Sequence, residues 1–254
     1  QYVHTFDKCF FMPSDLTAGL EYNRDRLKDN MWGYNRHTDQ TVNIYSAFLQ
    51  NEWKNDRWGI LIGGRLDKHN MVDNVIFSPR ANLRFNPTQN INLRLSYSSG
   101  FRAPQAFDED MHIENVGGTV AMIERAKDLK EEKSQSFSVS ADMYHRFGAF
   151  QTNLLIEGFY TRLTDVFVLG KPYDRGDGIL VKTRSNGPGA KVMGLTLEGK
   201  VAYLSILQIQ AGLTLQRSRY DEPHKWHDDA PAEKKIFRTP DTYGYFTATC
   251  TPIK

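Results

Sequence analysis

Alternation of apolar and polar residues with a period of two is the feature that most constrains the fold of this chain. It is clearest in the stretches 79–85, 91–98, 135–146 and 206–217, where apolar residues are separated mainly by Ser, Asn, Gln or Arg. Successive residues of a β-strand point to opposite faces, so each stretch predicts a strand with one apolar and one polar face. The predicted fold class is therefore all-β.

The predicted strands are long for a soluble protein. Most of them have about 8–13 residues, whereas soluble strands have about 5–6 and a tilted strand that crosses a bilayer needs about 9–11. They are expected at 1–11, 16–26, 42–53, 57–68, 79–85, 91–98, 135–146, 150–163, 192–203, 206–217 and 242–250.

The connections between these strands alternate in length. Short links fall at 12–15, 54–56, 86–90, 147–149 and 204–205, and long ones at 27–41, 68–78, 99–134, 164–191 and 218–241. A membrane barrel has short periplasmic turns and long extracellular loops, so this order predicts the wall of an antiparallel up-and-down transmembrane β-barrel. Aromatic residues bracket the short links, as expected of an interfacial girdle: Phe10, Phe11, Trp53, Trp58, Phe147, Phe150 and Tyr203.

The polar composition agrees with a wide barrel. Only alternate residues of such a wall meet lipid, while the others face a polar lumen. We expect one outer face to carry Leu83, Leu93, Leu95, Val139, Ile156, Leu197, Ile209 and Leu213, and the other face Arg84, Arg94 and Gln210. Further lumen candidates are Arg80, Asp142, Glu157, Glu198 and Lys200. The formal net charge of +2 provides no long-range attraction to nucleic acid.

Two sequence boxes carry a resemblance to a known family. Residues 96–104 have the sequence SYSSGFRAP, and AKDLKEEKSQSFSVSADMY follows about thirty residues later. The pair resembles the GFRAP box and the N-P-x-L-x-P-E-x-S stretch in the C-terminal barrel of TonB-dependent receptors. Gly100 to Pro104 match the first box; Ala126 and Lys127 replace the usual Asn-Pro of the second box, and Glu131 replaces its Pro. The segments 51–69 and 78–97 also resemble barrel strands of this family.

The resemblance implies a barrel of about 22 strands that is closed by a plug domain. Residues 1–254 are then a partial barrel domain with about eleven strands, whose edges are the segments 1–11 and 242–250, while the plug and the final strands lie elsewhere. It implies an outer-membrane importer of a Gram-negative bacterium that takes up a scarce nutrient such as a ferric siderophore, haem or cobalamin. The implied partners are outer-membrane lipid, lipopolysaccharide, a small-molecule ligand, and the TonB complex through the plug.

Two other classes of function stay open at this point. One is a passive porin or a surface adhesin, which would be a barrel without a plug. The other is a soluble β-sandwich that acts as a binding module. The sequence has no GxSxG, HExxH or P-loop motif, so it predicts no catalytic residues and no cofactor.

The long loops supply the candidate ligand-binding residues. Aromatic rings can pack against flat ligands and guanidinium groups pair with anionic ones. The candidates are Phe101, Arg102, His112, Arg125, Tyr173, Tyr220 and Trp226. Haem-type members of the family have a haem-ligating His between the two boxes, and His112 lies in that interval. For Arg102 and Pro104 a structural role is the alternative, since Pro104 can end a strand and Arg102 can pair with lumen acids.

Two loop segments contain residue types that bind metals, but neither predicts a metal site. The segment 224–229 has two His and two Asp residues without a fixed geometry. The segment 174–178 resembles the start of a calcium loop but lacks its remaining acidic positions.

Overall fold

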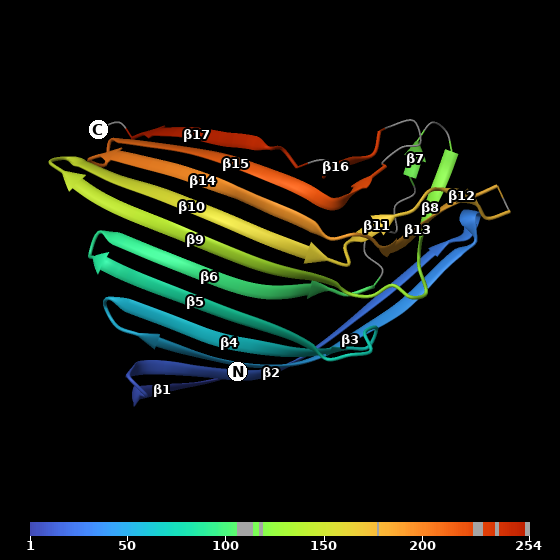
Figure 1. The fold of residues 1–254 in the computed structure, drawn as a ribbon, viewed down its shortest axis with the longest axis horizontal. Helices are drawn as coiled ribbons and strands as arrows, with labels where there is room; N and C mark the ends of the chain where they lie inside the picture. Colours follow the sequence, from blue (N-terminus) through green and yellow to red (C-terminus); the bar gives the residue numbers. More distant parts are fainter. Residues whose placement is uncertain (106–113, 117–118, 177, 226–230, 237–238, 252–254) are drawn as a thin grey trace.

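The computed structural model describes residues 1–105, 114–116, 119–176, 178–225, 231–236 and 239–251. Within them the main sheet has 12 strands. These are β1 (Tyr2–Cys9), β2 (Met12–Met31), β3 (Arg36–Lys54), β4 (Trp58–His69), β5 (Ile76–Thr88), β6 (Ile91–Arg102), β9 (Glu132–Phe147), β10 (Phe150–Thr164), β14 (Ala190–Tyr203), β15 (Leu207–His224), β16 (Glu233–Lys235) and β17 (Thr242–Cys250). Of these strands, β1 to β15 follow one another across a single antiparallel wall, and both β16 and β17 pair with β15 (Figure 1).

The strand register places the predicted apolar set on one face. Leu83 is opposite Leu95, and Leu95 is opposite Val139, in a row that continues through Gly158 to Leu195. A second row joins Leu93, Ile156, Leu197 and Leu213, and Ile209 lies on the same side of β15. The row that contains Arg84 and Arg94, and the row that contains Gln210, lie on the opposite face. The facing prediction is therefore confirmed.

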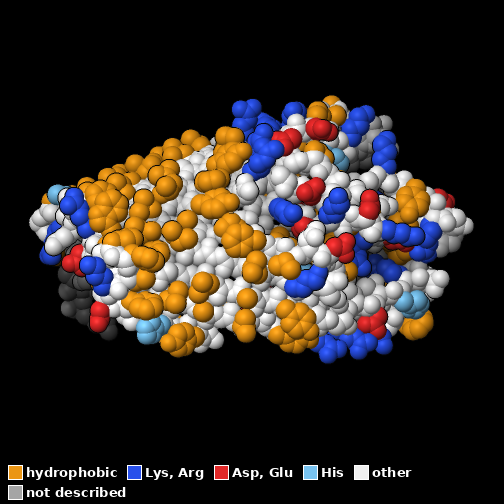
Figure 2. All heavy atoms as spheres, turned by 60° about the horizontal axis from the view of Figure 1, so that its bottom comes forward, with side chains coloured by type: hydrophobic (Ala, Val, Ile, Leu, Met, Phe, Trp, Pro, Cys, Tyr) orange, Lys and Arg blue, Asp and Glu red, His pale blue; other side chains and the backbone are white. Residues whose placement is uncertain are grey.

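The apolar face is exposed instead of packed. Val139 is 58% exposed, Leu95 51% and Leu213 43%. Figure 2 shows hydrophobic side chains spread over the wall, with charged side chains gathered at its ends. Because one sheet leaves this face open, the β-sandwich alternative is wrong. No described helix is long and apolar enough to cross a membrane.

Aromatic residues bound the apolar band on both sides. We call the belt at the end with the short turns the lower belt, and the belt at the end with the long connections the upper belt. In the lower belt Phe11 stacks on Trp53, Trp58 on Phe85, and Phe147 on Phe150. The upper belt contains Tyr22, Tyr45, Tyr97, Phe137 and Tyr160, and its rings Tyr22 and Tyr45 stack at 4.9 Å between centroids. Two such belts are what amphipathic rings form at the two interfaces of a bilayer.

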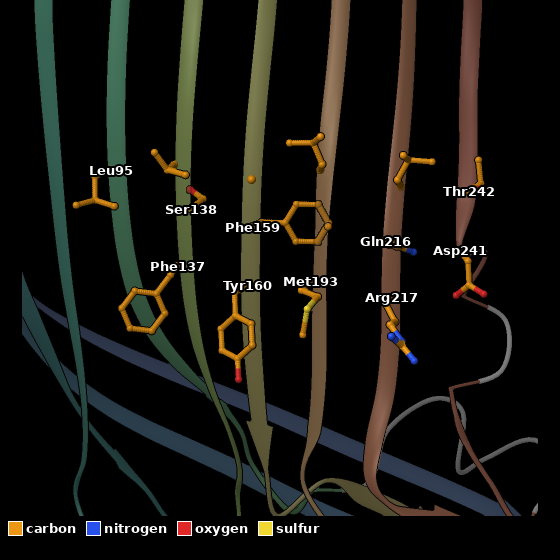
Figure 3. Close-up of a pocket in the computed structure, with 15 residues that line it drawn as sticks. Leu95, Phe137, Ser138, Phe159, Tyr160, Met193, Gln216, Arg217, Asp241 and Thr242 are labelled. Carbon is orange, nitrogen blue, oxygen red and sulfur yellow. The ribbon is translucent and has the colours of Figure 1, made fainter.

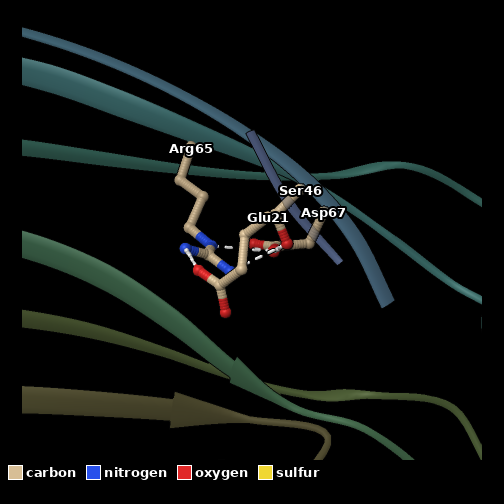
Figure 4. Close-up of polar contacts among 4 residues, drawn as sticks. All are labelled: Glu21, Ser46, Arg65 and Asp67. Carbon is tan, nitrogen blue, oxygen red and sulfur yellow. Dashed lines mark hydrogen bonds and ion pairs between the residues drawn. The ribbon is translucent and has the colours of Figure 1, made fainter. Parts of the chain in front are cut away.

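The opposite face of the wall is polar and carries hydrogen-bonded charge. Arg65 donates to Glu21 at 3.0 Å, to Asp67 at 2.8 Å and to Ser46 at 2.8 Å, and Ser46 donates to Asp67 at 2.6 Å (Figure 4). Asp67 is only 3% exposed. A buried carboxylate needs such partners, so the cluster ties β2, β3 and β4 together on the luminal side.

The prediction of a loop at 27–41 was wrong, and the predicted loops 99–134, 164–191 and 218–241 also contain strands. The segment 27–41 is mostly strand, because β2 and β3 stay paired up to Met31 and Arg36. The single-turn helix η1 (Trp32–Tyr34) closes this hairpin. Cross-strand polar pairs replace apolar contacts here, among them Arg26 to Asp39 at 2.7 Å and Arg36 to Asp29 at 2.9 Å. Both faces of the extension are polar and rise above the upper belt, so no apolar alternation marks them as strands.

Two of the long connections, 99–134 and 164–191, form a second sheet at the same end of the wall. It has β7 (Glu114–Val116), β8 (Thr119–Arg125), β11 (Phe167–Leu169), β12 (Tyr173–Asp174) and β13 (Leu180–Asn186). Strands β8 and β13 run parallel, and Met122 and Val181, opposite each other, are almost completely buried. These strands lie beside the tip of the β2–β3 hairpin (Figure 1).

The main sheet is open at both sides. In the part of the chain that the structure describes, β1 pairs only with β2 and β17 only with β15. The prediction that these strands are the edges of the wall is confirmed.

Candidate functional site

A cavity of about 740 Å³ lies where the long connections meet. It is lined by residues of the β2–β3 hairpin tip, the β4–β5 loop, the segment after β6, strand β8 and its following turn, and the turn after β12. The lining residues are Asn35–Thr38, Asn70, Met71, Pro104, Ile123–Lys127, Leu129 and Arg175. Segments that are more than 130 residues apart in sequence thus meet in one site, which we call the mouth cavity.

The mouth cavity has an excess of positive charge. Arg36, Arg125, Lys127 and Arg175 line it, whereas Glu124 is the acidic residue of the lining and Asp29 pairs with Arg36 from outside the lining. Arg175 is 3.6 Å from Glu124, and Arg125 donates to the carbonyl oxygen of Pro104 at 2.9 Å. Lys127 is exposed. Guanidinium groups held in this way can form paired hydrogen bonds to a carboxylate, catecholate or phosphate ligand.

A buried histidine fixes one side of this cavity. His69 is fully buried at the end of β4. Its Nδ1 accepts a hydrogen bond from the Met71 backbone N–H at 3.0 Å, so its Nε2 carries the proton and donates to Gln105 at 3.2 Å. The imidazole thereby holds the β4–β5 loop against the start of the connection after β6.

Two other predicted binding residues, Phe101 and Arg102, do not line the cavity. Phe101 packs against Val72, Ile76 and Ala103. Arg102 lies over the Phe167 ring, 5.5 Å from its centroid. Of the three predicted residues Phe101, Arg102 and Arg125, only Arg125 lines the cavity. Phe101 and Arg102 contact the β4–β5 loop and β11, next to the cavity.

The two tyrosines have different surroundings. Tyr220 is buried with Val166 and Ala190, and its burial raises the pKa of its hydroxyl. Tyr173 is exposed on β12, two residues before the cavity residue Arg175. The predicted residues His112 and Trp226 lie outside the described part of the chain.

Asn70, Met71 and Ile123 line the cavity but were not identified from the sequence. No motif marks them, because only the folding of separate loops brings them together. Among the described residues, no three His, Cys, Asp or Glu side chains come together as a metal site.

Comparisons with known proteins fit this architecture. The family described as TonB dependent receptor-like, beta-barrel matches residues 2–249. The probable hemoglobin and hemoglobin-haptoglobin-binding protein 3 of Haemophilus influenzae is 23% identical over 206 residues, which are 79% of this chain and 18% of that protein.

Two solved structures share the fold. The siderophore receptor PirA of Pseudomonas aeruginosa superposes with a TM-score of 0.71 at 17% identity, over 85% of this chain and 41% of that one. The FrpB iron transporter of Neisseria meningitidis (F5-1 variant) gives 0.61 at 16% identity, over 89% and 36%. This chain thus spans less than half of each solved structure. The match to residues 2–249 covers nearly the whole sequence, and the chain belongs to the TonB dependent receptor-like β-barrel family.

Proposed function

We propose that this chain forms part of the wall of a Gram-negative outer-membrane importer that takes up a scarce nutrient as an anionic chelate, with energy from the TonB complex. The observation that carries the proposal is the cationic mouth cavity, which lies at the end of the wall where the long connections gather. A ferric siderophore with anionic oxygen donors fits this charge better than a neutral sugar does.

The relatives point in the same direction. They include proteins described as a siderophore receptor, an iron transporter and a hemoglobin-binding protein. The open edges at β1 and β17 support a larger barrel, since unpaired backbone groups in hydrocarbon cost several kcal/mol each. We propose that further strands of the receptor pair with both edges.

The test is binding and uptake by the whole receptor in cells with and without TonB. Ferric chelates of graded negative charge serve as probes. We expect uptake to require TonB while surface binding persists without it. Equal uptake in both strains would contradict the proposal and would favour a passive porin instead.

Charge variants test the cavity itself. We expect the double variant Lys127→Gln/Arg175→Gln to weaken binding of an anionic ferric chelate by roughly tenfold or more, since hydrogen bonds to charged groups contribute about 1.5–3 kcal/mol. Lys8→Gln is the matched control, because Lys8 is an exposed cation at the end of the wall with the short turns. Unchanged affinity in the double variant would refute the cavity as the binding site.

The same assay with haem assigns the ligand class. His112→Ala is expected to leave ferric chelate binding intact. A selective loss of haem binding in this variant would instead identify the nutrient as haem.

A further inference from the structure

A groove crosses the outward, apolar face of the wall below the upper belt. It is a shallow, open hollow with a volume of about 780 Å³ and a mostly apolar lining. Its floor is Gly158, which lies between Val139 and Leu195 in the cross-strand row and has no side chain to fill the space. Leu95 and Leu215 continue this row on either side (Figure 3).

At its end nearest the long connections, the groove reaches the cationic side chain of Arg217. The next outward row runs from Phe137 through Tyr160 and Met193 to Arg217. In Figure 3 the Tyr160 hydroxyl and the Arg217 guanidinium both point toward the end with the long connections. Arg217 is therefore level with the upper aromatic belt, where lipid headgroups begin.

One step above Arg217 the outward row is strongly cationic. Arg162, Lys191, Arg219 and Lys235 are directly opposite one another on β10, β14, β15 and β16. Like charges that are directly opposite each other on a sheet destabilise it. We therefore expect the positive charge of this row to be neutralised by nearby anions.

The protein's own carboxylates neutralise only part of this charge. Asp221 is 2.9 Å from Lys191 and 3.5 Å from Arg162, and Asp241 is 2.8 Å from Lys235. Within the described ranges, Arg217 and Arg219 have no side-chain hydrogen bond or ion pair, and their charges act on Asp241 only from a longer distance. Among the described residues of this surface, the five cations and these two carboxylates leave an excess of three positive charges at headgroup depth.

We propose that this surface is a binding site for lipid A, the phosphorylated glycolipid anchor of lipopolysaccharide, with one acyl chain in the groove over Gly158 and a phosphate at Arg217 and Arg219. The end with the long connections faces the outer leaflet in this family, so the lipid is that of the outer leaflet. Guanidinium groups bind phosphate oxygens in paired hydrogen bonds, and a phosphate monoester carries a charge of about −1.5 to −2 at pH 7.

Native mass spectrometry of the whole receptor in detergent tests this site with three lipids. These are lipid A, lipid A from which the phosphates have been removed, and phosphatidylglycerol of matched acyl length. Removal of the phosphates is expected to weaken binding roughly 10- to 100-fold, the equivalent of one or two charge-assisted hydrogen bonds. This comparison needs no substitution, so it cannot be confused with misfolding.

Two variants separate the headgroup from the chain. Arg217→Gln/Arg219→Gln is expected to bind lipid A and its dephosphorylated form alike. Gly158→Leu fills the groove, and it fits because a Cβ there would meet only Val139 at 3.7 Å. We expect it to weaken all three lipids. Gly199→Leu is the matched control, since Gly199 is also outward, has nothing within 4 Å of a Cβ, and lies outside the groove.

Three outcomes would overturn the proposal: equal binding of lipid A with and without phosphate, equal binding of lipid A and phosphatidylglycerol, or a Gly158→Leu variant that behaves like Gly199→Leu. Because the assay uses neither an iron chelate nor TonB, its result does not depend on the import function.

Discussion

The strands between the two aromatic belts and the same strands above the upper belt are one continuous sheet, but they follow different rules. Between the belts, outward residues such as Leu95 and Val139 are apolar and exposed, and in β6 and β9 the residues between them are polar. Beyond the upper belt, β2 and β3 continue as a hairpin with polar residues on both faces, held by ion pairs such as Arg26–Asp39. Contact with lipid therefore requires the alternation of apolar and polar residues. Beyond the upper belt, hydrogen bonds between the strands extend the sheet without that alternation.

The largest effect should come from placing a charge in the band. Ala141 faces outward midway between the belts, opposite Leu93 and Ile156. We expect Ala141→Arg to reduce the free energy of unfolding of the receptor in lipid vesicles by about 2–4 kcal/mol. Ser140→Arg is the control, because Ser140 is next to Ala141 in the sequence but faces the lumen, opposite Glu157. Equal losses of unfolding free energy in the two variants would contradict the assignment of one face to lipid and the other to the lumen.

A smaller effect is expected from the luminal charge cluster. Arg65→Ala removes three hydrogen bonds and leaves the buried Asp67 carboxylate with Ser46. We expect a loss of about 1–3 kcal/mol in denaturant unfolding. Arg80→Ala, at another inward arginine that is exposed, should change stability by less than about 0.5 kcal/mol. A larger loss in Arg80→Ala would show that inward charge is not paired as the structure indicates.

At the mouth cavity the effect should be local. His69→Ala removes the hydrogen bond from the Met71 N–H and the hydrogen bond to Gln105, which together link the β4–β5 loop to Gln105. Hydrogen exchange should accelerate at 70–75 and 103–105, while amides of the band stay protected, because the rows of the wall do not depend on this contact. Faster exchange throughout β4 and β5 would instead make His69 part of the stability of the wall.

The smallest effect is expected at the hairpin extension. Arg26 donates two hydrogen bonds to Asp39 and holds the pKa of that carboxyl below its ordinary value. A lowered pKa means that the pair contributes stability above the pKa of Asp in the unfolded chain, and that this contribution is lost as the pH falls through the folded pKa. Exchange protection of 27–41 should therefore be constant from pH 7 to 5 and decline only in stronger acid. Arg26→Ala should remove this decline.

The same contrast explains what could be predicted from the sequence. The facing of Leu83, Leu197 and Arg94 was predicted correctly, since a shift of one residue would invert every side chain and lipid fixes the phase. The lower belt was also predicted, because aromatic residues flank the short turns.

Above the upper belt the prediction failed for physical reasons. The segment 27–41 was predicted as a loop because solvent on both faces removes the apolar signal. Arg125 was identified as a binding candidate, but Asn70 and Met71 were not, because their place in the mouth cavity depends on how separate loops pack. Tyr220, another binding candidate, is buried beside Val166.

The most direct test of the two-faced wall is a cysteine scan of 137–143 in β9. The native Cys9 and Cys250, which form no disulfide, are first replaced by Ser. Single cysteines in the whole receptor, reconstituted in lipid vesicles, are then spin-labelled and measured for collisions with oxygen, which partitions into lipid, and with a water-soluble nickel chelate. The structure predicts that labels at 137, 139, 141 and 143 collide with oxygen, and those at 138, 140 and 142 with the chelate. Accessibility that does not alternate, or that alternates in the opposite phase, would contradict the assignment of the outward face to lipid.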